Sequence, residues 1–279
     1  MGKTVGIDIG GTTTKIVGID GGKLFSPLLV KATDPVSSIY GAFGKFLTEN
    51  KLQLSNIDRI MVTGVGSTFI NERIFSIPTY KVDEFVAIGL GGLFLSDLER
   101  AVIVSMGTGT AYVMADGEEA YHMGGTGVGG GTLVGLANRM LNIRNFNDII
   151  EMAKDGDLTH IDLTIADITR DGPAGLTKET TASNFGKMLD LATNADVALG
   201  IINLVFQTIG MMAVFASRNE QAKDVVLTGN LATVPQTSQI FQGLTDLFGI
   251  NFHIPDHAEY ATATGASLIS PGHRAKKVG

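Results

Sequence analysis

Hydrophobic and polar residues alternate along this chain in two patterns, one typical of strands and one typical of helices. The run Thr4–Gly21 consists of an apolar, β-rich segment, a Gly/Thr turn and a second β-rich segment that ends in Asp-Gly. The run Ala101–Gly117 has the same layout. Each run is therefore predicted to form a β-hairpin with glycine and threonine at its tip.

The two predicted hairpins align without a gap. At a constant offset, Asp8 matches Ser105, Gly10 matches Gly107 and Thr13 matches Thr110. Two such turns can also arise by chance in a glycine-rich chain. The match therefore indicates an internal repeat only if other elements support it.

The remaining patterns predict an alternation of strands and helices, which favours an α/β architecture with parallel strand pairing beyond the hairpins. A boundary between an N-terminal domain, residues 1–98, and a C-terminal domain, residues 99–279, is expected in the polar stretch Ser96–Arg100. Helices are predicted over residues 35–50, 85–95, 135–141, 146–155, 181–192, 197–219 and 237–248, and short strands over residues 57–62, 225–227 and 251–254.

One segment, Val197–Ala216, is long and apolar enough to resemble a membrane span. Asn203 and Gln207 interrupt it four residues apart, so on a helix they would share one face at the centre of a membrane. We therefore expect a buried core or interface helix and no membrane association. The N-terminus has no uninterrupted apolar segment of a secretory signal, so a cytoplasmic protein is expected.

Composition excludes several classes of function. The 279 residues include 21 Lys and Arg against 28 Asp and Glu, and the net charge of −7 argues against nucleic-acid binding. With no cysteine, the chain cannot hold a disulfide, a thiolate zinc site, an iron–sulfur cluster or a cysteine nucleophile. There are 36 glycines but only 7 prolines, and 44% of the residues are hydrophobic. This glycine is therefore expected in tight turns and where the backbone approaches a ligand.

The two Gly/Thr tips have the composition of phosphate-binding turns. Their backbone N–H groups and threonine hydroxyls can hold a phosphate without a basic side chain. Asp8 lies where a metal-bound phosphate would arrive, and Mg²⁺ prefers carboxylate, water and phosphate oxygens. Taken singly, however, each tip is more typical of a plain hairpin turn, with Asp8 ending a strand.

Two further glycine elements follow later in the chain. Gly124–Thr132 has six glycines in its first eight residues and precedes the helix-compatible run Leu133–Leu141, so its amides can open a helix toward an anion. It matches neither the P-loop nor the Rossmann pattern, and a flexible hinge is the alternative. Thr228-Gly229-Asn230 follows a short strand and can approach an adenosine or form an ordinary β-turn.

These four elements, in the order DxGGTxxK, GTGT, GTGxGGG and TGN, resemble the actin-like ATPase superfamily of sugar kinases, heat-shock chaperones and actins. Within it the chain is similar to type II pantothenate kinases. The matching segments are Gly6–Lys15, Asp83–Leu90, Gly107–Thr110, Gly124–Gly131 and Thr181–Gly186, in colinear order over nearly the whole chain. The resemblance implies an α/β fold of two ribonuclease-H-like domains with the nucleotide in the cleft between them. It also implies a homodimer that phosphorylates pantothenate, the first step of coenzyme A biosynthesis.

The resemblance further implies roles for individual residues, with ATP and Mg²⁺ as cofactors. Glu84 is the implied general base, although Asp83 and Glu84 also suit the start of a helix, where acidic side chains stabilise the dipole. Asp8 is the implied metal ligand. The implied ATP-binding residues are Asp8, Gly10, Gly11, Thr12, Thr13, Lys15, Gly107, Thr108, Gly109, Thr110, Gly129, Gly130, Gly131, Gly229 and Asn230, and the implied pantothenate-binding residues are Glu84, His122, Gly124, Gly125 and Thr126.

His122 departs from the family pattern, which has an arginine two residues before the glycine cluster. Histidine is shorter, mostly neutral at pH 7 and unable to make bidentate contacts. It could donate one hydrogen bond to pantothenate, serve a different acceptor, or be structural. Two alternatives therefore stay open: a kinase for a sugar or another small alcohol, and a non-catalytic, ATP-driven conformational protein. The absence of cysteine disfavours the zinc-containing sugar kinases and the iron–sulfur activators of radical enzymes.

Overall fold

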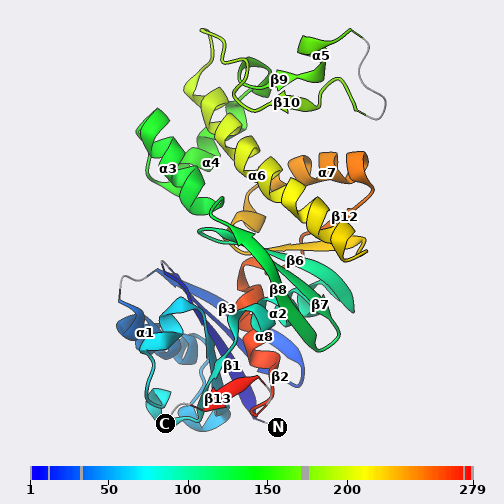
Figure 1. The fold of residues 1–279 in the computed structure, drawn as a ribbon. Coiled ribbons are helices and arrows are strands. Elements are labelled where there is room, and N and C mark those ends of the chain that lie inside the picture. Colours follow the sequence, from blue (N-terminus) through cyan, green and yellow to red (C-terminus); the bar gives the residue numbers. More distant parts are fainter. Residues whose placement is uncertain (1, 12, 32–33, 171–175, 273, 278–279) are drawn as a thin grey trace.

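The chain folds into two lobes, each built on a mixed β-sheet (Figure 1). The computed structural model describes residues 2–11, 13–31, 34–170, 176–272 and 274–277. The sheet of the first lobe has the strand order β13-β5-β4-β1-β2-β3. Its strands are β1 (Lys3–Ile9), β2 (Thr13–Asp20), β3 (Lys23–Lys31), β4 (Ile57–Thr63), β5 (Thr79–Val82) and β13 (Ala275–Lys277).

The sheet of the second lobe has the order β12-β11-β6-β7-β8, which repeats the order β5-β4-β1-β2-β3 of the first sheet without its edge strand β13. In each lobe three strands form an antiparallel meander and two more pair in parallel beside its first strand. Asp8 pairs with Thr63 of the parallel neighbour, and the matching Ser105 pairs with Thr228. The repeat predicted from the two hairpins is therefore confirmed. The strands are β6 (Arg100–Met106), β7 (Thr110–Asp116), β8 (Glu119–Thr126), β11 (Asp224–Thr228) and β12 (Asn251–His253).

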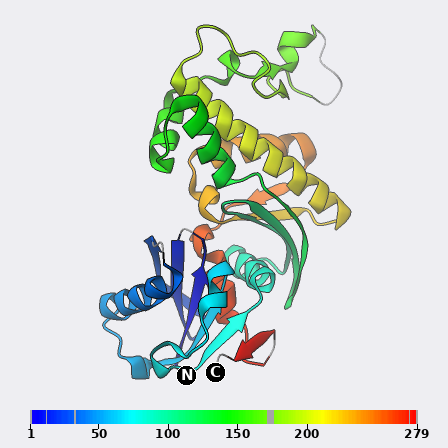
Figure 2. The same cartoon turned by 60° about the vertical axis from the view of Figure 1, so that its left-hand side comes forward.

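Two helices lie between the sheets, and each packs on the sheet of the other half of the sequence (Figure 2). Helix α2 (Glu84–Ser96) packs on β6, β7 and β8, whereas α8 (Ala261–Leu268) packs on β1, β2 and β4. Strand β13 then joins the edge of the first sheet beside β5. The chain thus crosses between the lobes twice, and its division into domains 1–98 and 99–279 stays a prediction.

Helix α1 (Pro35–Glu49) covers the outer face of the first sheet. Asp34 caps its start, because the Asp34 carboxylate accepts a hydrogen bond of 2.6 Å from the backbone N–H of Ser37. The apolar face of α1 includes Ile39, Phe43 and Phe46, which are fully buried against the sheet. Burying such side chains is the main stabilising contribution to this lobe.

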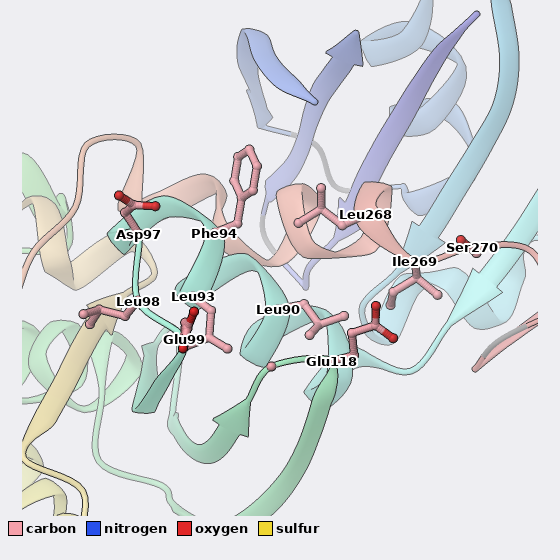
Figure 3. A pocket seen from close by; sticks show the side chains of 11 residues that line it. Leu90, Leu93, Phe94, Asp97, Leu98, Glu99, Glu118, Leu268, Ile269 and Ser270 are labelled. Atoms are coloured by element: carbon pink, nitrogen blue, oxygen red, sulfur yellow. The ribbon is translucent and has the colours of Figure 1, made fainter. Parts of the chain in front are cut away.

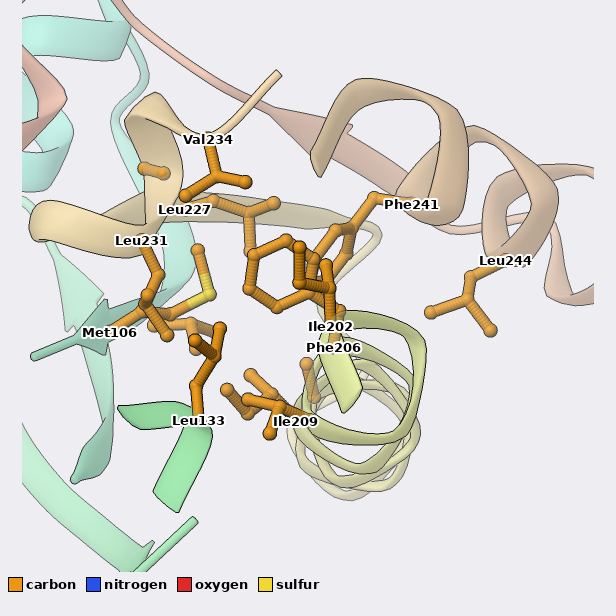
Figure 4. Close-up of a cluster of buried hydrophobic side chains, with 14 of the residues drawn as sticks. Met106, Leu133, Ile202, Phe206, Ile209, Leu227, Leu231, Val234, Phe241 and Leu244 are labelled. Carbon is orange, nitrogen blue, oxygen red and sulfur yellow. The ribbon is translucent and has the colours of Figure 1, made fainter. Parts of the chain in front are cut away.

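Helices α6 (Asn194–Asn219) and α7 (Gln236–Phe248) pack on the outer face of the second sheet, and α3 (Gly130–Leu141) and α4 (Phe146–Met152) pack on α6. Figure 4 shows their core, in which Phe206 of α6 packs near Phe241 of α7. Helix α6 has the length and hydropathy of a membrane span, but 67% of its most apolar window is buried inside the protein. It is the central core helix of the lobe.

The predicted helix over residues 181–192 is wrong. Thr181–Ser183 form strand β10, which pairs with β9 (Leu163–Thr164), and turns follow. Phe185 and Met188 have positive φ angles of 57° and 36°, which an α-helix does not allow. The buried carboxylate of Asp162 accepts a hydrogen bond of 2.8 Å from the Phe185 N–H and so holds this turn.

Several elements were not predicted at all, namely β3, β5, β8, β9, β13, α8 and the short helix α5 (Ile165–Ile168). Single-turn 3₁₀ helices occur at Leu54–Asn56, Val65–Phe69, Ile74–Ser76, Ala153–Asp155, Leu158–His160, Asn230–Thr233 and Ala258–Tyr260.

Candidate active site

The tips of the two Gly/Thr hairpins border one cavity between the lobes. In the first tip the N–H of Gly10 donates to the Thr13 carbonyl oxygen at 2.9 Å, and in the second the N–H of Gly107 donates to the Gly109 carbonyl oxygen at 2.9 Å. The cavity has a volume of about 520 Å³. Such a volume is typical of small-molecule sites.

Most of the residues implied by the resemblance line this cavity. They are Asp8, Gly10, Gly11, Thr13, Lys15, Glu84, Gly107, Thr108, Gly109, Thr110, His122, Gly125, Thr126, Gly229 and Asn230. Thr12 lies outside the described residues. Six further residues line the cavity that were not among the predicted site residues, namely Val65, Phe85, Ile88, Ser105, Ala111 and Thr262.

The glycines at the start of α3 hold the second tip by hydrogen bonds. The N–H groups of Gly130 and Gly131 donate to the carbonyl oxygens of Gly107 and Thr108, each at 2.9 Å. A Cβ on Gly129 would lie 2.6 Å from the Thr108 carbonyl oxygen, so only glycine permits this approach. Gly124 and Gly129 to Gly131 are not among the described residues that line the cavity. Contact of these four glycines with a ligand stays a prediction.

The turn after β11 brings Asn230 to the cavity. Gly229 has φ = 86°, and a Cβ there would lie 2.5 Å from the Met106 carbonyl oxygen, which explains the glycine. The side-chain oxygen of Asn230 is buried and has no hydrogen-bond partner among the described residues. A buried carbonyl oxygen without a donor costs about 1–3 kcal/mol. A bound ligand with an N–H or O–H group would supply this donor.

Asp8 and Lys15 face each other across the first hairpin. They are partners in the β1–β2 register, and Lys15 is only 7% exposed. Burial raises the pKa of Asp8, and the positive charge of Lys15 opposes this shift. Burial lowers the pKa of Lys15, against the opposing charges of Asp8 and Glu259. The positive charge of Lys15 thus does not fully offset the cost of burying the negative charge of Asp8. A cation in the cavity would stabilise the ionised carboxylate.

This arrangement fits Mg²⁺ bound together with phosphates. Among the described residues, no cluster of three or more His, Cys, Asp or Glu side chains could enclose a metal ion. Mg²⁺ does not need such a cluster, because it keeps several waters and takes one or two carboxylates plus phosphate oxygens. Asp8 is the carboxylate that could hold it.

Glu84 has a free carboxylate beside this pair. It is the first residue of α2, but the helix is capped by Asp83, whose carboxylate accepts a hydrogen bond of 3.0 Å from the Val86 N–H. The Glu84 side chain makes no hydrogen bond or ion pair with any described residue. Burial raises the pKa of Glu84, and the carboxylates of Asp8 and Asp83 raise it further. A partly buried carboxylate with a raised pKa is suited to accept a proton near neutral pH.

Activity should therefore have an acidic limit set above the ordinary glutamate pKa of 4.5. As the pH falls through the raised pKa, Glu84 is protonated and can no longer accept a proton, so kcat/KM falls. Since Glu84 and Asp8 interact, the apparent pKa belongs to the pair. Measuring kcat/KM from about pH 4 to about pH 9 checks this, and an acid limb centred at or below 4.5 would contradict it.

His122 of β8 stacks on Phe85 of α2. The ring centroids are 3.9 Å apart and the ring planes differ by 15°. Both rings line the cavity, so the stack joins the start of α2, which carries Glu84, to the strand that carries Gly125 and Thr126. The place of Phe85 next to Glu84 is the only sequence signal that could have pointed to it.

The family of the chain is shown by comparison with known proteins. The family model described as Fumble matches residues 100–268, which is more than half of the chain. The chain belongs to the Fumble family. The matched range contains the second tip, the glycine cluster, His122 and Asn230, whereas Asp8 and Glu84 lie before it.

Individual relatives are similar to nearly the full length of the chain, beyond the range that the family model matches. Proteins named type II pantothenate kinase are 26–28% identical to this Fumble family member. The one from Staphylococcus epidermidis is 28% identical over 275 residues, which cover 95% of this chain and 99% of that protein.

Solved structures confirm the expected fold. Component A of (R)-2-hydroxyglutaryl-CoA dehydratase from Acidaminococcus fermentans superposes with a TM-score of 0.67 at 18% identity, covering 96% of this chain and 97% of that one. A ROK family glucokinase from Streptomyces griseus, in complex with glucose and AMPPNP, superposes with a TM-score of 0.64 at 11% identity, covering 95% and 98%. This Fumble family chain thus has the two-domain α/β fold of the actin-like ATPases.

Proposed function

We propose that this protein transfers the γ-phosphoryl group of ATP to the hydroxyl group of pantothenate, the first step of coenzyme A biosynthesis. The names of its relatives over nearly the whole chain support a pantothenate kinase. The observation that carries the proposal is the placement of the unpartnered Glu84 carboxylate on the same cavity as Asp8 and both Gly/Thr tips. Phosphoryl transfer needs this combination of phosphate-binding amides, a metal-facing carboxylate and one base.

The two tips are the proposed triphosphate site. Gly10, Gly11 and Thr13 lie on one side of the cavity, and Gly107 to Thr110 lie on the other. The N–H groups of Gly10 and Gly107 are engaged within the tips, so the amides of Gly11, Thr108 and Gly109 are the ones proposed to bind phosphate oxygens from both lobes. Asn230 is proposed to accept a hydrogen bond from the adenosine part of ATP. When bound, Mg²⁺ would neutralise charge on the phosphates, and Asp8 is the residue that would hold it.

Glu84 is the proposed general base. It accepts the proton of the pantothenate hydroxyl, whose oxygen forms a bond to the γ-phosphorus while the bond from that phosphorus to the bridging oxygen of ADP breaks. The products are 4'-phosphopantothenate and ADP. Positioning by both lobes contributes most of the rate, and the base adds about 10²–10⁴-fold.

The acceptor is proposed to lie along β8. His122, Gly125 and Thr126 line the cavity there, and the stack on Phe85 holds the imidazole of His122 beside the start of α2, which carries Glu84. An imidazole in this place can donate one hydrogen bond to the carboxylate of pantothenate.

We also propose that the enzyme is a cytoplasmic homodimer with domains 1–98 and 99–279. Exposed apolar side chains on the second lobe support an association of two copies. Leu191 is 64% exposed, Phe215 of α6 is 61% exposed and Met140 of α3 is 45% exposed. Burial of these side chains against a second copy would remove their apolar surface from water.

An acceptor screen with Mg-ATP tests the reaction, repeated with His122→Arg. We expect ADP to form only with pantothenate, and the arginine to lower the KM for pantothenate about three- to tenfold, because it pairs with the acceptor carboxylate. Phosphorylation of glucose but not pantothenate would favour a sugar kinase. Hydrolysis of ATP at the same rate with or without any acceptor would favour an ATP-driven conformational protein.

A further inference from the structure

A second cavity lies at the other end of α2 from Glu84 (Figure 3). Its volume is about 620 Å³, which exceeds the 520 Å³ of the catalytic cavity. It is lined by Leu90, Leu93, Phe94, Asp97, Leu98, Glu99, Gly117, Glu118, Leu268, Ile269 and Ser270. None of these residues borders the catalytic cavity, so the two sites are separate.

The walls of the second cavity belong to both lobes. One wall is the end of α2 with the turn between β7 and β8, which packs with the second sheet. The other wall is the end of α8, which packs on the first sheet. A ligand in this cavity would therefore contact the two lobes at once.

Helices α2 and α8 cross between the two cavities. Glu84 at the start of α2 and Thr262 at the start of α8 line the catalytic cavity, whereas Phe94 and Leu268 at their ends line the second one. At the crossing, a Cβ on Gly91 would lie 1.8 Å from the Ala261 carbonyl oxygen. The two backbones are in direct contact there, so the crossing is a natural pivot for movement of the lobes.

The chemistry of the second cavity is apolar with an acidic rim. Six apolar side chains form its walls, of which Leu93 and Ile269 are buried and Phe94 is 36% exposed. Asp97, Glu99 and Glu118 are the charged residues that line it, and all three are acidic.

These three carboxylates have no ion-pair partner among the described residues. Arg100 pairs with Asp116, and Arg274 pairs with Glu119. Arg274 also donates a hydrogen bond of 3.4 Å to the Glu118 carbonyl oxygen, so one positive charge lies beside this part of the rim. An apolar cavity with an excess of negative charge at its rim is complementary to a molecule with an apolar body and one positive charge.

We propose that the second cavity binds a small organic ammonium ion with an apolar chain or ring, and that its occupation slows phosphoryl transfer. A volume of this size is typical of sites for small organic ligands. The bound ligand holds the ends of α2 and α8 at a fixed separation. Closure of the catalytic cavity about the crossing would change that separation, so the ligand opposes closure. Inhibition should then lower kcat without raising the KM for ATP.

The test uses 4-phenylbutylamine as the probe, with 4-phenylbutanol and 4-phenylbutyrate as its neutral and anionic counterparts. Binding to the full-length chain is followed without ATP by methyl NMR, with Ile269 reporting on the second cavity and Ile88 on the catalytic one. We expect the amine to shift the Ile269 methyl signal and to bind about tenfold more tightly than the alcohol. The anion should bind more weakly than both.

Charge variants separate specific binding from general attraction to an acidic protein. The double variant Glu99→Gln, Glu118→Gln should weaken amine binding about fivefold or more, whereas Glu72→Gln, a matched change on the exposed surface of the first lobe, should leave it unchanged. Saturating amine should lower kcat of the unmodified enzyme and have less effect on the double variant.

Equal binding of the three probes, an unshifted Ile269 signal, or undiminished affinity in the double variant would overturn the ligand site. A dimer that dissociates in the double variant would also overturn it, because a second copy would then be the occupant. Binding at Ile269 with unchanged kcat would overturn the coupling to catalysis. Since binding is measured without ATP, failure of the pantothenate assay would leave this result intact.

Discussion

Replacing Glu84 by glutamine should lower kcat about a thousandfold while changing the affinity for ATP less than about twofold. Glutamine keeps the size of the side chain but cannot accept the proton of the attacking hydroxyl. Helix α2 should keep its start, because its capping hydrogen bond comes from Asp83 and not from Glu84. The loss should therefore be in the chemical step, and coupled ADP assays together with calorimetry of ATP binding would measure the two effects separately.

The neighbouring variant Asp83→Asn is the matched control. Asparagine is as good a helix cap as aspartate, so the fold and turnover near neutral pH should change little. One of the negative charges that raise the pKa of Glu84 is removed, so the acid limb of kcat/KM should move to lower pH. Unimpaired turnover in Glu84→Gln would exclude Glu84 as the base. An equal loss of turnover in Asp83→Asn would show that turnover depends on the combined negative charge of Asp83 and Glu84, and not on the Glu84 carboxylate alone.

Local chemistry explains which parts of the fold could be predicted from the sequence. The hairpins were predictable because strand alternation and the Gly/Thr turns are both encoded within about 18 residues. Their match at Asp8 and Ser105 indicated the repeat, which the matching order of five strands in the two sheets confirms. The long apolar pattern of α6 was equally plain, and its buried position followed from Asn203, which donates a hydrogen bond of 2.6 Å to Asp162.

Elements whose pattern depends on distant contacts were missed. Helix α8 has the sequence ATATGASL, and it shows no apolar stripe because Ala261 to Ser267 are all buried between α2 and the first sheet. The predicted helix over residues 181–192 does not form. The buried Asp162 carboxylate accepts a hydrogen bond from the Phe185 N–H and so holds a turn there.

The site was predicted in its components but not in its arrangement. A glycine-rich sequence shows that backbone groups can approach something closely, but not what they approach. The amides of Gly130 and Gly131 donate to the Gly107–Gly109 turn, while the amides of that turn border the cavity. The second cavity had no sequence signal, because its walls come from residues as far apart as Leu93, Glu118 and Leu268.

Replacing Gly265 by alanine should destabilise the protein by about 2–3 kcal/mol, because the new methyl group has no space at the crossing of α2 and α8. A Cβ there would lie 1.8 Å from the Ala87 carbonyl oxygen and 2.5 Å from the Gly91 nitrogen. Both atoms belong to the backbone of α2, so no side-chain rotation can make room. The two helices, and with them the two lobes, must move apart.

Gly41→Ala in α1 is the matched control, since a Cβ at Gly41 meets nothing within 4 Å. There alanine should stabilise the protein by about 0.5–1 kcal/mol through its helix propensity. Both substitutions reduce the entropy of the unfolded chain equally. The difference between their free energies of unfolding in urea therefore isolates the contact at the crossing. If Gly265→Ala were as stable as Gly41→Ala, the backbones of α2 and α8 would not touch, and the crossing could not serve as the pivot between the two cavities.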